Sequence, residues 1–215
     1  MSCGRAIVVV AAAMPLLSGC LIRDVSQTWY VAEDGAVTWV VMEKDVRSDA
    51  TQAAERHAEE QTYYLAVTSE THPVAQGFRA VGAERLRTRV LRSELPFTVV
   101  TEGRFPGLDV LGQRLIAASG LTGSSIVVRD GRVWEWTMTM RESQTDVGRD
   151  VSEDVQALLT DFERVNVVLV AGQFETGRGF TLSADRRVAT LADDGTREAD
   201  SAGVMVVALR WIASK

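Results

Sequence analysis

Histidine is the side chain best suited to acid–base chemistry near neutral pH, and this chain has only two, His57 and His72. Glu55 and Glu59 lie close to His57 in the sequence, so His57 could act as a general base. In the expected helix, however, both glutamates project from the other side, whereas His57 falls on the weakly apolar face. We therefore expect His57 to be a packing or interface residue. His72 precedes Pro73 and is expected to begin a helix or a turn.

Serine and carboxylate patterns do not complete a catalytic or metal site. Residues 120–125 are rich in Gly and Ser, but they lack the G-x-S-x-G spacing of a nucleophile elbow and the Lys of a P-loop. No H-E-x-x-H motif or Cys/His cluster is present. Two groups of carboxylates depart from the calcium-loop pattern: Asp24, Asp45 and Asp49, and Asp146, Asp150 and Asp154. We expect no metal, no cofactor and no catalytic residue, and a hydrolase using His57 is kept as a third function hypothesis.

A stripe of large apolar side chains alternates along one expected strand: Trp134, Trp136, Met138 and Met140. Alternate residues share one face of a strand. Most stripes of this kind pack into an ordinary core. The functional interpretation is an apolar cavity or groove, because Met-rich surfaces repack around varied ligands. These four residues are therefore the candidate ligand-binding site, and residues 172–180 are a candidate mouth or a glycine-kinked strand.

Three Asp-Gly pairs punctuate the chain: Asp34-Gly35, Asp130-Gly131 and Asp194-Gly195. An Asp-Gly pair between strand-like runs is typical of a tight β-hairpin, because the turn needs positive φ angles. Runs rich in β-branched and aromatic residues predict strands at 26–33, 36–43, 85–91, 98–104, 125–129, 132–141, 166–171, 179–182, 187–192 and 203–212. The short apolar run 167–171 is expected in the middle of a sheet.

Apolar residues at helical spacing predict helices over 49–67, 108–118 and 150–162, with a shorter one over 74–81. Hairpins and adjacent strands favour antiparallel pairing, and no βαβ series with a Gly-rich turn is visible. The sequence therefore predicts an α+β fold, with a mainly antiparallel β-sheet and three to four helices packed on one face.

The first twenty residues have the parts of a secretory signal: a positive Arg5, an apolar run over 6–17, and small residues before Cys20. The segment Leu17-Ser18-Gly19-Cys20 resembles the lipobox of a bacterial lipoprotein. This resemblance implies cleavage after residue 19 and lipidation of Cys20 by a diacylglycerol and acyl chains such as palmitate. It predicts a signal peptide over 1–19, a lipidated cysteine with a short tether over 20–24, and a single α+β domain over 25–215.

The same resemblance bears on location. Leu21 rather than Asp follows the cysteine, which in a Gram-negative cell envelope implies the periplasmic face of the outer membrane. The net charge of −6 argues against a nucleic acid as partner and against a basic patch that docks on anionic lipid.

Two other function hypotheses fit the sequence better than a hydrolase does. The first is a non-enzymatic envelope lipoprotein that acts as a protein-binding or accessory subunit, since the sequence shows no catalytic pattern. The alternative is a carrier or sensor of an apolar ligand that uses the Trp134 and Trp136 face.

Overall fold

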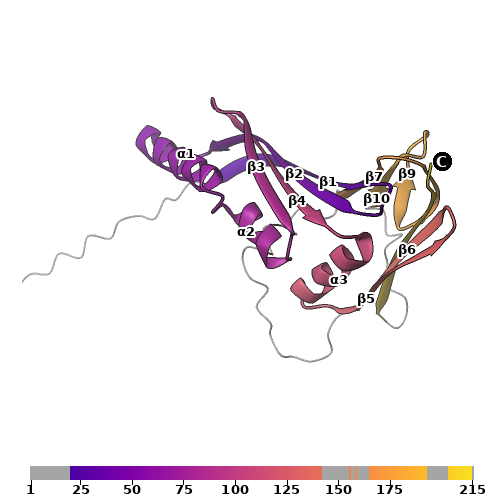
Figure 1. Ribbon diagram of the computed structural model, residues 1–215. Coiled ribbons are helices and arrows are strands. Elements are labelled where there is room, and N and C mark those ends of the chain that lie inside the picture. The colour runs from indigo at the N-terminus through magenta and orange to yellow at the C-terminus, as the bar shows by residue number, and fades with distance from the viewer. Residues whose placement is uncertain (1–19, 142–154, 156–157, 159–164, 193–202, 215) are drawn as a thin grey trace, which may run out of the picture.

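The computed structural model describes residues 20–141, 155, 158, 165–192 and 203–214 (Figure 1). Within them the chain forms, in order, β1 (Leu21–Val31), β2 (Val37–Ser48), α1 (Ala53–Thr68), α2 (Pro73–Ala80), β3 (Arg85–Arg92), β4 (Phe97–Phe105), α3 (Leu108–Ala118), β5 (Thr122–Asp130), β6 (Val133–Arg141), β7 (Val165–Leu169), β8 (Gln173–Arg178), β9 (Phe180–Leu182), β10 (Val188–Leu191) and β11 (Val204–Ile212). The predicted α+β class is confirmed, and the strand pairing is mainly antiparallel.

A seven-stranded sheet in the order β3-β4-β2-β1-β7-β10-β9 forms the larger layer. The Asp34-Gly35 hairpin joins its two longest strands: Gly35 has φ +86°, and Asp34 Oδ1 accepts the N–H of Ala36 at 3.0 Å. β7 pairs in parallel with β1 and antiparallel with β10, so the expected central position of this apolar strand is confirmed.

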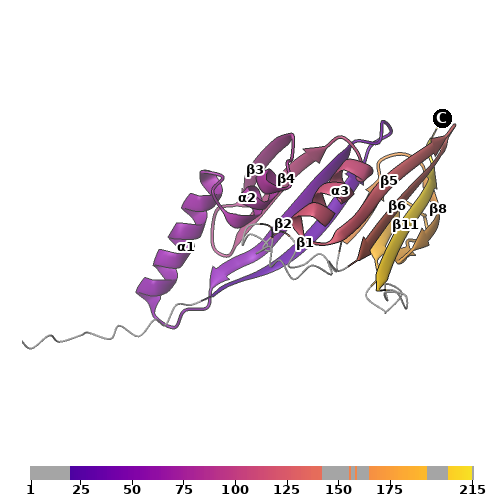
Figure 2. The same ribbon diagram turned by 90° about the horizontal axis from the view of Figure 1, so that it is seen from below.

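One face of this sheet is covered by helices (Figure 2). From α1, Tyr63 stacks on Phe97 of β4 with ring centroids 6.3 Å apart. From α2, Phe78 meets Trp39 of β2 edge to face at 5.1 Å. The opposite face carries the alternate residues, such as Tyr30, and no described helix packs on it. We call it the open face.

The expectation of a single sheet is wrong. β5, β6, β11 and β8 form a second, four-stranded antiparallel sheet. α3 packs mainly on β5, where Ser125 Oγ donates to the backbone oxygen of Leu108 at 3.1 Å. Hairpin signals predict which neighbouring strands pair, but the second sheet depends on β11 joining β6 and β8 across long stretches of chain.

The main core lies between the two sheets and the helices, and it includes all five tryptophans. Trp29, Trp39 and Trp136 are almost completely buried. Trp29 contacts Trp39 at a centroid distance of 5.7 Å within the large sheet, and Trp136 of the small sheet at 6.1 Å. Burial of such large rings is a main source of stability in a fold whose described residues contain no disulfide.

Several local expectations are corrected. Residues 21–24, predicted as a short tether after Cys20, belong instead to β1, which begins at Leu21 paired with Ser48. Of the two alternatives for 172–180, the glycine-kinked strand is confirmed, because the stretch forms β8 and part of β9 on either side of Gly179, which has φ +74°. Residues 122–125 belong to β5. The helix predicted over 150–162, the Asp194-Gly195 pair and the group Asp146, Asp150 and Asp154 lie outside the described residues, apart from the buried Val155 and Leu158.

Candidate functional site: an apolar cavity between the sheets

A cavity of about 210 Å³ lies where β6 and β11 of the small sheet approach α3 and the large sheet. Its described lining is almost entirely apolar. It consists of Trp29, Leu115, Ile116, Ser119, Leu121, Trp136, Met138, Met140, Val165, Phe180, Leu191, Met205 and Val207.

The strands of the small sheet place its methionines side by side. Alternation along β6 directs Trp136, Met138 and Met140 to one face. In the antiparallel register of β6 and β11, Met205 lies opposite Met140, and Val207 lies opposite Met138. One wall of the cavity is therefore built from two adjacent strands with matching apolar positions.

Three of the four predicted ligand-binding residues line this cavity, and Trp134 does not. Trp134 stacks on Trp211 with ring centroids 5.8 Å apart, and the guanidinium of Arg129 lies 4.6 Å from its ring. It borders a separate, more polar depression together with Gly35. Trp136, by contrast, is fully buried, and its Nε1 donates to Ser125 Oγ at 2.9 Å.

Other elements contribute residues to the lining that no motif in the sequence indicates. Trp29, Phe180 and Val165 come from strands far away in the chain, and only the fold brings them to β6. For one of these elements, β11, the sequence does carry a signal. Residues 204–209 form a continuous apolar run typical of a buried strand, and Met205 and Val207 lie two residues apart and therefore share one face of it.

Catalytic groups are absent from the described lining of the cavity. Ser119 supplies its one hydroxyl group, and that hydroxyl donates to the backbone oxygen of Ile116 at 3.2 Å. General acid–base or nucleophilic catalysis needs a titratable or activated group beside the substrate. This arrangement is suited to binding an apolar group.

A second cluster, buried between α1, α2 and the large sheet, is polar. Glu43 forms an ion pair with Arg23 at 3.0 Å and accepts the hydroxyl of Tyr63 at 3.2 Å. His72 Nε2 shares a hydrogen bond of 3.1 Å with the hydroxyl of Thr101 and lies 3.9 Å from the Glu43 carboxylate. The sequence pattern does not indicate this cluster, because His72 before Pro73 predicts only the start of a helix or a turn.

Burial dominates the titration of this cluster. It raises the pKa of Glu43, although Arg23 and Tyr63 favour the carboxylate and reduce the effect. Burial, together with the Glu43 charge, also raises the pKa of Tyr63. Burial, reinforced by Arg23 and Arg79, lowers the pKa of His72 to about 4, so this imidazole is neutral at physiological pH. The network is only partly satisfied among the described residues, because Glu43 Oε1 has the Arg23 ion pair but no hydrogen bond, and His72 Nδ1 is buried without a hydrogen-bond partner.

The packing alternative for His57 is wrong, whereas its interface alternative stays a prediction. Its side chain is exposed, as is that of Ala54, whereas Glu60, Tyr63 and Val67 form the buried face of α1. The weak apolar pattern of this helix led to the wrong phase, because buried polar residues replace an apolar stripe.

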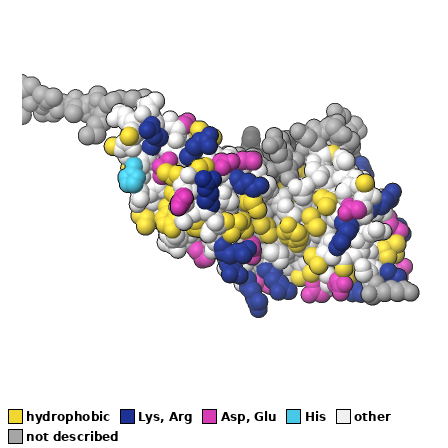
Figure 3. Space-filling view, turned by 90° about the horizontal axis from the view of Figure 1, so that it is seen from above, with side chains coloured by type: hydrophobic (Ala, Val, Ile, Leu, Met, Phe, Trp, Pro, Cys, Tyr) yellow, Lys and Arg dark blue, Asp and Glu magenta, His cyan; other side chains and the backbone are white. Residues whose placement is uncertain are grey.

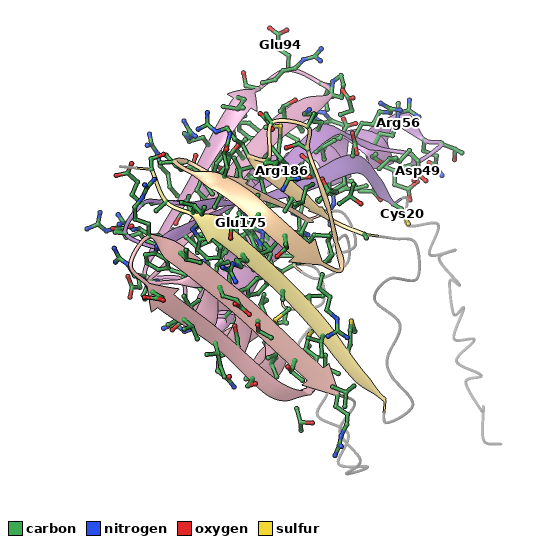
Figure 4. All side chains as sticks on the ribbon, turned by 90° about the vertical axis from the view of Figure 1, so that its right-hand side faces the viewer. Cys20, Asp49, Arg56, Glu94, Glu175 and Arg186 are labelled. Atoms are coloured by element: carbon green, nitrogen blue, oxygen red, sulfur yellow. The ribbon has the colours of Figure 1, made fainter. Side chains whose placement is uncertain are left out.

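Cys20 lies at the end of the large sheet that is distant from Glu175 and Arg186 (Figure 4). It is exposed and forms no disulfide. Its backbone N–H donates to Asp49 Oδ1 at 2.6 Å, and the N–H of Asp49 donates to the Cys20 backbone oxygen at 3.1 Å. The cysteine is therefore held at the edge of the fold without a flexible spacer.

Two further features are missing from the described part of the chain. No three His, Cys, Asp or Glu side chains are grouped so that they could hold a metal ion. No described helix has both the length and the apolar character needed to cross a membrane.

Comparisons with known proteins identify no family. No family model and no curated protein matches the chain. Among solved structures, the folded domain of the Mycobacterium tuberculosis protein LppM is 9% identical with a TM-score of 0.36, covering 90% of this chain and 91% of that one. The Mu homology domain of Fcho1 from Danio rerio, solved with a bound Eps15 peptide, is 8% identical with a TM-score of 0.23, covering 92% of this chain and 79% of that one. Scores this low establish neither a common fold nor a common function.

Proposed function

We propose that this chain is a lipoprotein of the bacterial envelope, anchored through Cys20, that carries or senses an apolar ligand in the cavity beside Trp136. The observation that carries the ligand proposal is the lining of the cavity, where aromatic, aliphatic and methionine side chains surround one hydroxyl group. Pockets with apolar walls and few polar groups are the usual form of small-ligand sites. The same composition supports a binding role rather than a catalytic one.

The size of the cavity limits the ligand. An apolar cavity of about 150 Å³ is enough to take up benzene, whereas sites for drug-sized molecules begin at about 300 Å³. At about 210 Å³, the cavity fits a small ring or part of one acyl chain rather than a complete phospholipid. The methionines at positions 138, 140 and 205 have flexible side chains that could adapt to different chains.

The anchor is supported by the lipobox-like segment that ends at Cys20 and by the exposed position of this residue at the start of β1. Two or three acyl chains would hold the protein firmly on a bilayer. Leu21 after the cysteine favours the periplasmic face of the outer membrane in a Gram-negative host.

Native mass spectrometry of the lipoprotein released from its own membrane tests both parts of the proposal. Lipidation predicts a mature chain that begins at Cys20 and has the added mass of its acyl groups. A ligand predicts a further, non-covalent mass that is depleted in Met140→Gln. Met42→Gln is the matched control, because Met42 is also a half-buried strand methionine but lies on the open face.

A mature chain with no bound mass, together with tryptophan fluorescence that short fatty acids do not change, would contradict the ligand proposal. That result would favour the accessory-subunit hypothesis, and crosslinking in the native membrane would then identify the protein partner. A chain without acyl groups would contradict the anchor independently of the ligand.

A further inference from the structure

The open face of the large sheet concentrates positive charge in a protein whose net charge is −6. Arg85 and Arg87 of β3 and Arg104 of β4 are all exposed there. Figure 3 shows this face, with Lys and Arg side chains gathered along one edge beside hydrophobic side chains. The negative net charge of the whole chain therefore coexists with a local basic surface. We call this surface the arginine cluster and define it as Arg85, Arg87 and Arg104.

Two of these arginines face each other directly. Arg85 and Arg104 are partners in the antiparallel register of β3 and β4. Like charges in directly opposed positions destabilise a sheet. Arg87 lies two residues along the same strand face, about 7 Å away. An anion placed between these guanidinium groups would remove the repulsion.

The protein does not supply that anion within the described residues. Glu102 lies opposite Arg87 in the register, but its carboxylate forms an ion pair with Arg89. No ion pair among the described side chains includes a member of the arginine cluster. The cluster borders a shallow depression of about 460 Å³ whose lining also includes Thr38 and Glu102.

Protection of a sheet edge explains only part of this pattern. Charged residues on an edge strand discourage pairing with other chains, and β3 is an edge strand. Arg104, however, belongs to β4, which has β3 on one side and β2 on the other. The charge of Arg104 therefore does not serve to prevent pairing of a sheet edge with another chain.

We propose that the arginine cluster binds phosphate groups of anionic lipids in the bilayer that holds Cys20, so that the open face docks on the membrane surface. This inference rests on the proposed anchor. Guanidinium groups match phosphate oxygens in a bidentate geometry. Two exposed apolar residues of β1, Ile22 and Tyr30, lie on the same face, and Ile22 is two residues from the anchor. Because β1 starts at Leu21, the sheet stays close to the bilayer.

Energy transfer from tryptophan to a dansylated lipid tests the proposal. The mature lipoprotein is reconstituted into vesicles of phosphatidylcholine alone or mixed with phosphatidylglycerol. We expect greater transfer in the anionic vesicles and loss of the increase at high salt, because salt screens exposed charges. Arg87→Glu should lower the ratio of docked to undocked protein roughly thirtyfold, and Arg87→Gln roughly fivefold. Arg178→Glu is the matched control, an exposed arginine of β8 in the small sheet.

Equal transfer in the two kinds of vesicle would overturn the proposal, and so would equal losses in Arg87→Glu and Arg178→Glu. If inorganic phosphate at constant ionic strength abolishes the increase, the cluster is a site for free phosphate and the lipid proposal is wrong. Failure of the anchor is distinguishable, because an unlipidated protein would also fail to float with phosphatidylcholine vesicles. A thermal melt of each variant shows whether it is folded, and Arg87→Gln tests the site if Arg87→Glu is not.

Discussion

Trp29 of β1 and Trp136 of β6 meet edge to face with ring centroids 6.1 Å apart, and both rings border the apolar cavity. The same contact therefore joins the two sheets and forms part of the candidate ligand site. Edge-to-face aromatic pairs contribute about 0.5–1.5 kcal/mol beyond the burial of their area. Changes to the hydrogen bond that orients Trp136 should consequently affect stability as well as the cavity.

Ser125→Ala should destabilise the protein by about 1–3 kcal/mol, because Trp136 Nε1 would lose its acceptor in a buried site and the Leu108 carbonyl would lose a donor. Urea denaturation followed by tryptophan fluorescence measures the loss. Ser124→Ala is the control, since Ser124 lies on the opposite face of β5 and is partly exposed. Equal unfolding midpoints for the two variants would show that this hydrogen-bond chain contributes nothing measurable.

Gly103→Ala should cost about 1–3 kcal/mol through overpacking. A Cβ atom at residue 103 would overlap Cδ1 of Phe78, which packs on β4 from α2. The backbone of Gly103 does not have a positive φ angle, so the effect is steric rather than conformational. In the double variant with Phe78→Leu, the penalty of the alanine should be smaller than in the single variant. A strictly additive double-mutant cycle would contradict this packing argument.

Local features were predictable from the sequence because they depend on the backbone conformations and spacing of residues that are close together in the chain. The Asp34-Gly35 turn needs a positive φ angle that glycine adopts readily, and the apolar spacing over 108–118 matches α3. The cavity was predictable only in part. The alternation along β6 identifies Trp136 and Met138, but Trp29 and Phe180 reach them through pairings between distant strands.

The buried polar cluster could not be predicted for a related reason. Glu43 and Tyr63 are residue types that usually lie at least partly in solvent, and their burial depends on the contacts that Glu43 makes with Tyr63 and Arg23. The face of α1 was assigned incorrectly because its buried positions include Glu60. The spacing of apolar residues cannot identify a helix face that is buried through contacts between polar side chains.

His72 should make the folded protein less stable as the pH falls. Its pKa is lowered to about 4 in the folded state, against an ordinary value near 6.5, so the unfolded chain binds more protons between these values. The contribution of His72 to stability is therefore present above pH 6.5 and is lost as the pH falls toward 4, by up to about 3 kcal/mol. The raised pKa of Glu43 acts in the opposite direction, which reduces the net slope.

A comparison of His72→Gln with the unsubstituted protein isolates this contribution. Glutamine can retain a hydrogen bond to Thr101 but does not titrate. In urea denaturation across pH 4.5–7, the stability of the unsubstituted protein should fall more steeply toward acid than that of the variant. His57→Gln, at an exposed position of α1, serves as the control for the substitution itself. Parallel curves for His72→Gln and the unsubstituted protein would refute a buried neutral imidazole.

Asp49→Ala should loosen the start of β1 without unfolding the rest of the sheet. Asp49 holds Cys20 with its carboxylate, so its loss removes one hydrogen bond at the strand end. A loss of about 1 kcal/mol should raise the exchange of the Leu21 and Ile22 amides roughly fivefold. Hydrogen exchange of the mature protein measures this change, and amides of β4 serve as an internal reference.

Asp49→Asn separates the effect of the hydrogen bond from that of the charge, because its side-chain oxygen can still accept the Cys20 N–H. Exchange that is faster in Asp49→Ala alone would show that the hydrogen bond keeps the anchor against the domain. Faster exchange in both variants would assign the effect to the charge, and no change in either would mean that strand pairing alone keeps Cys20 in place.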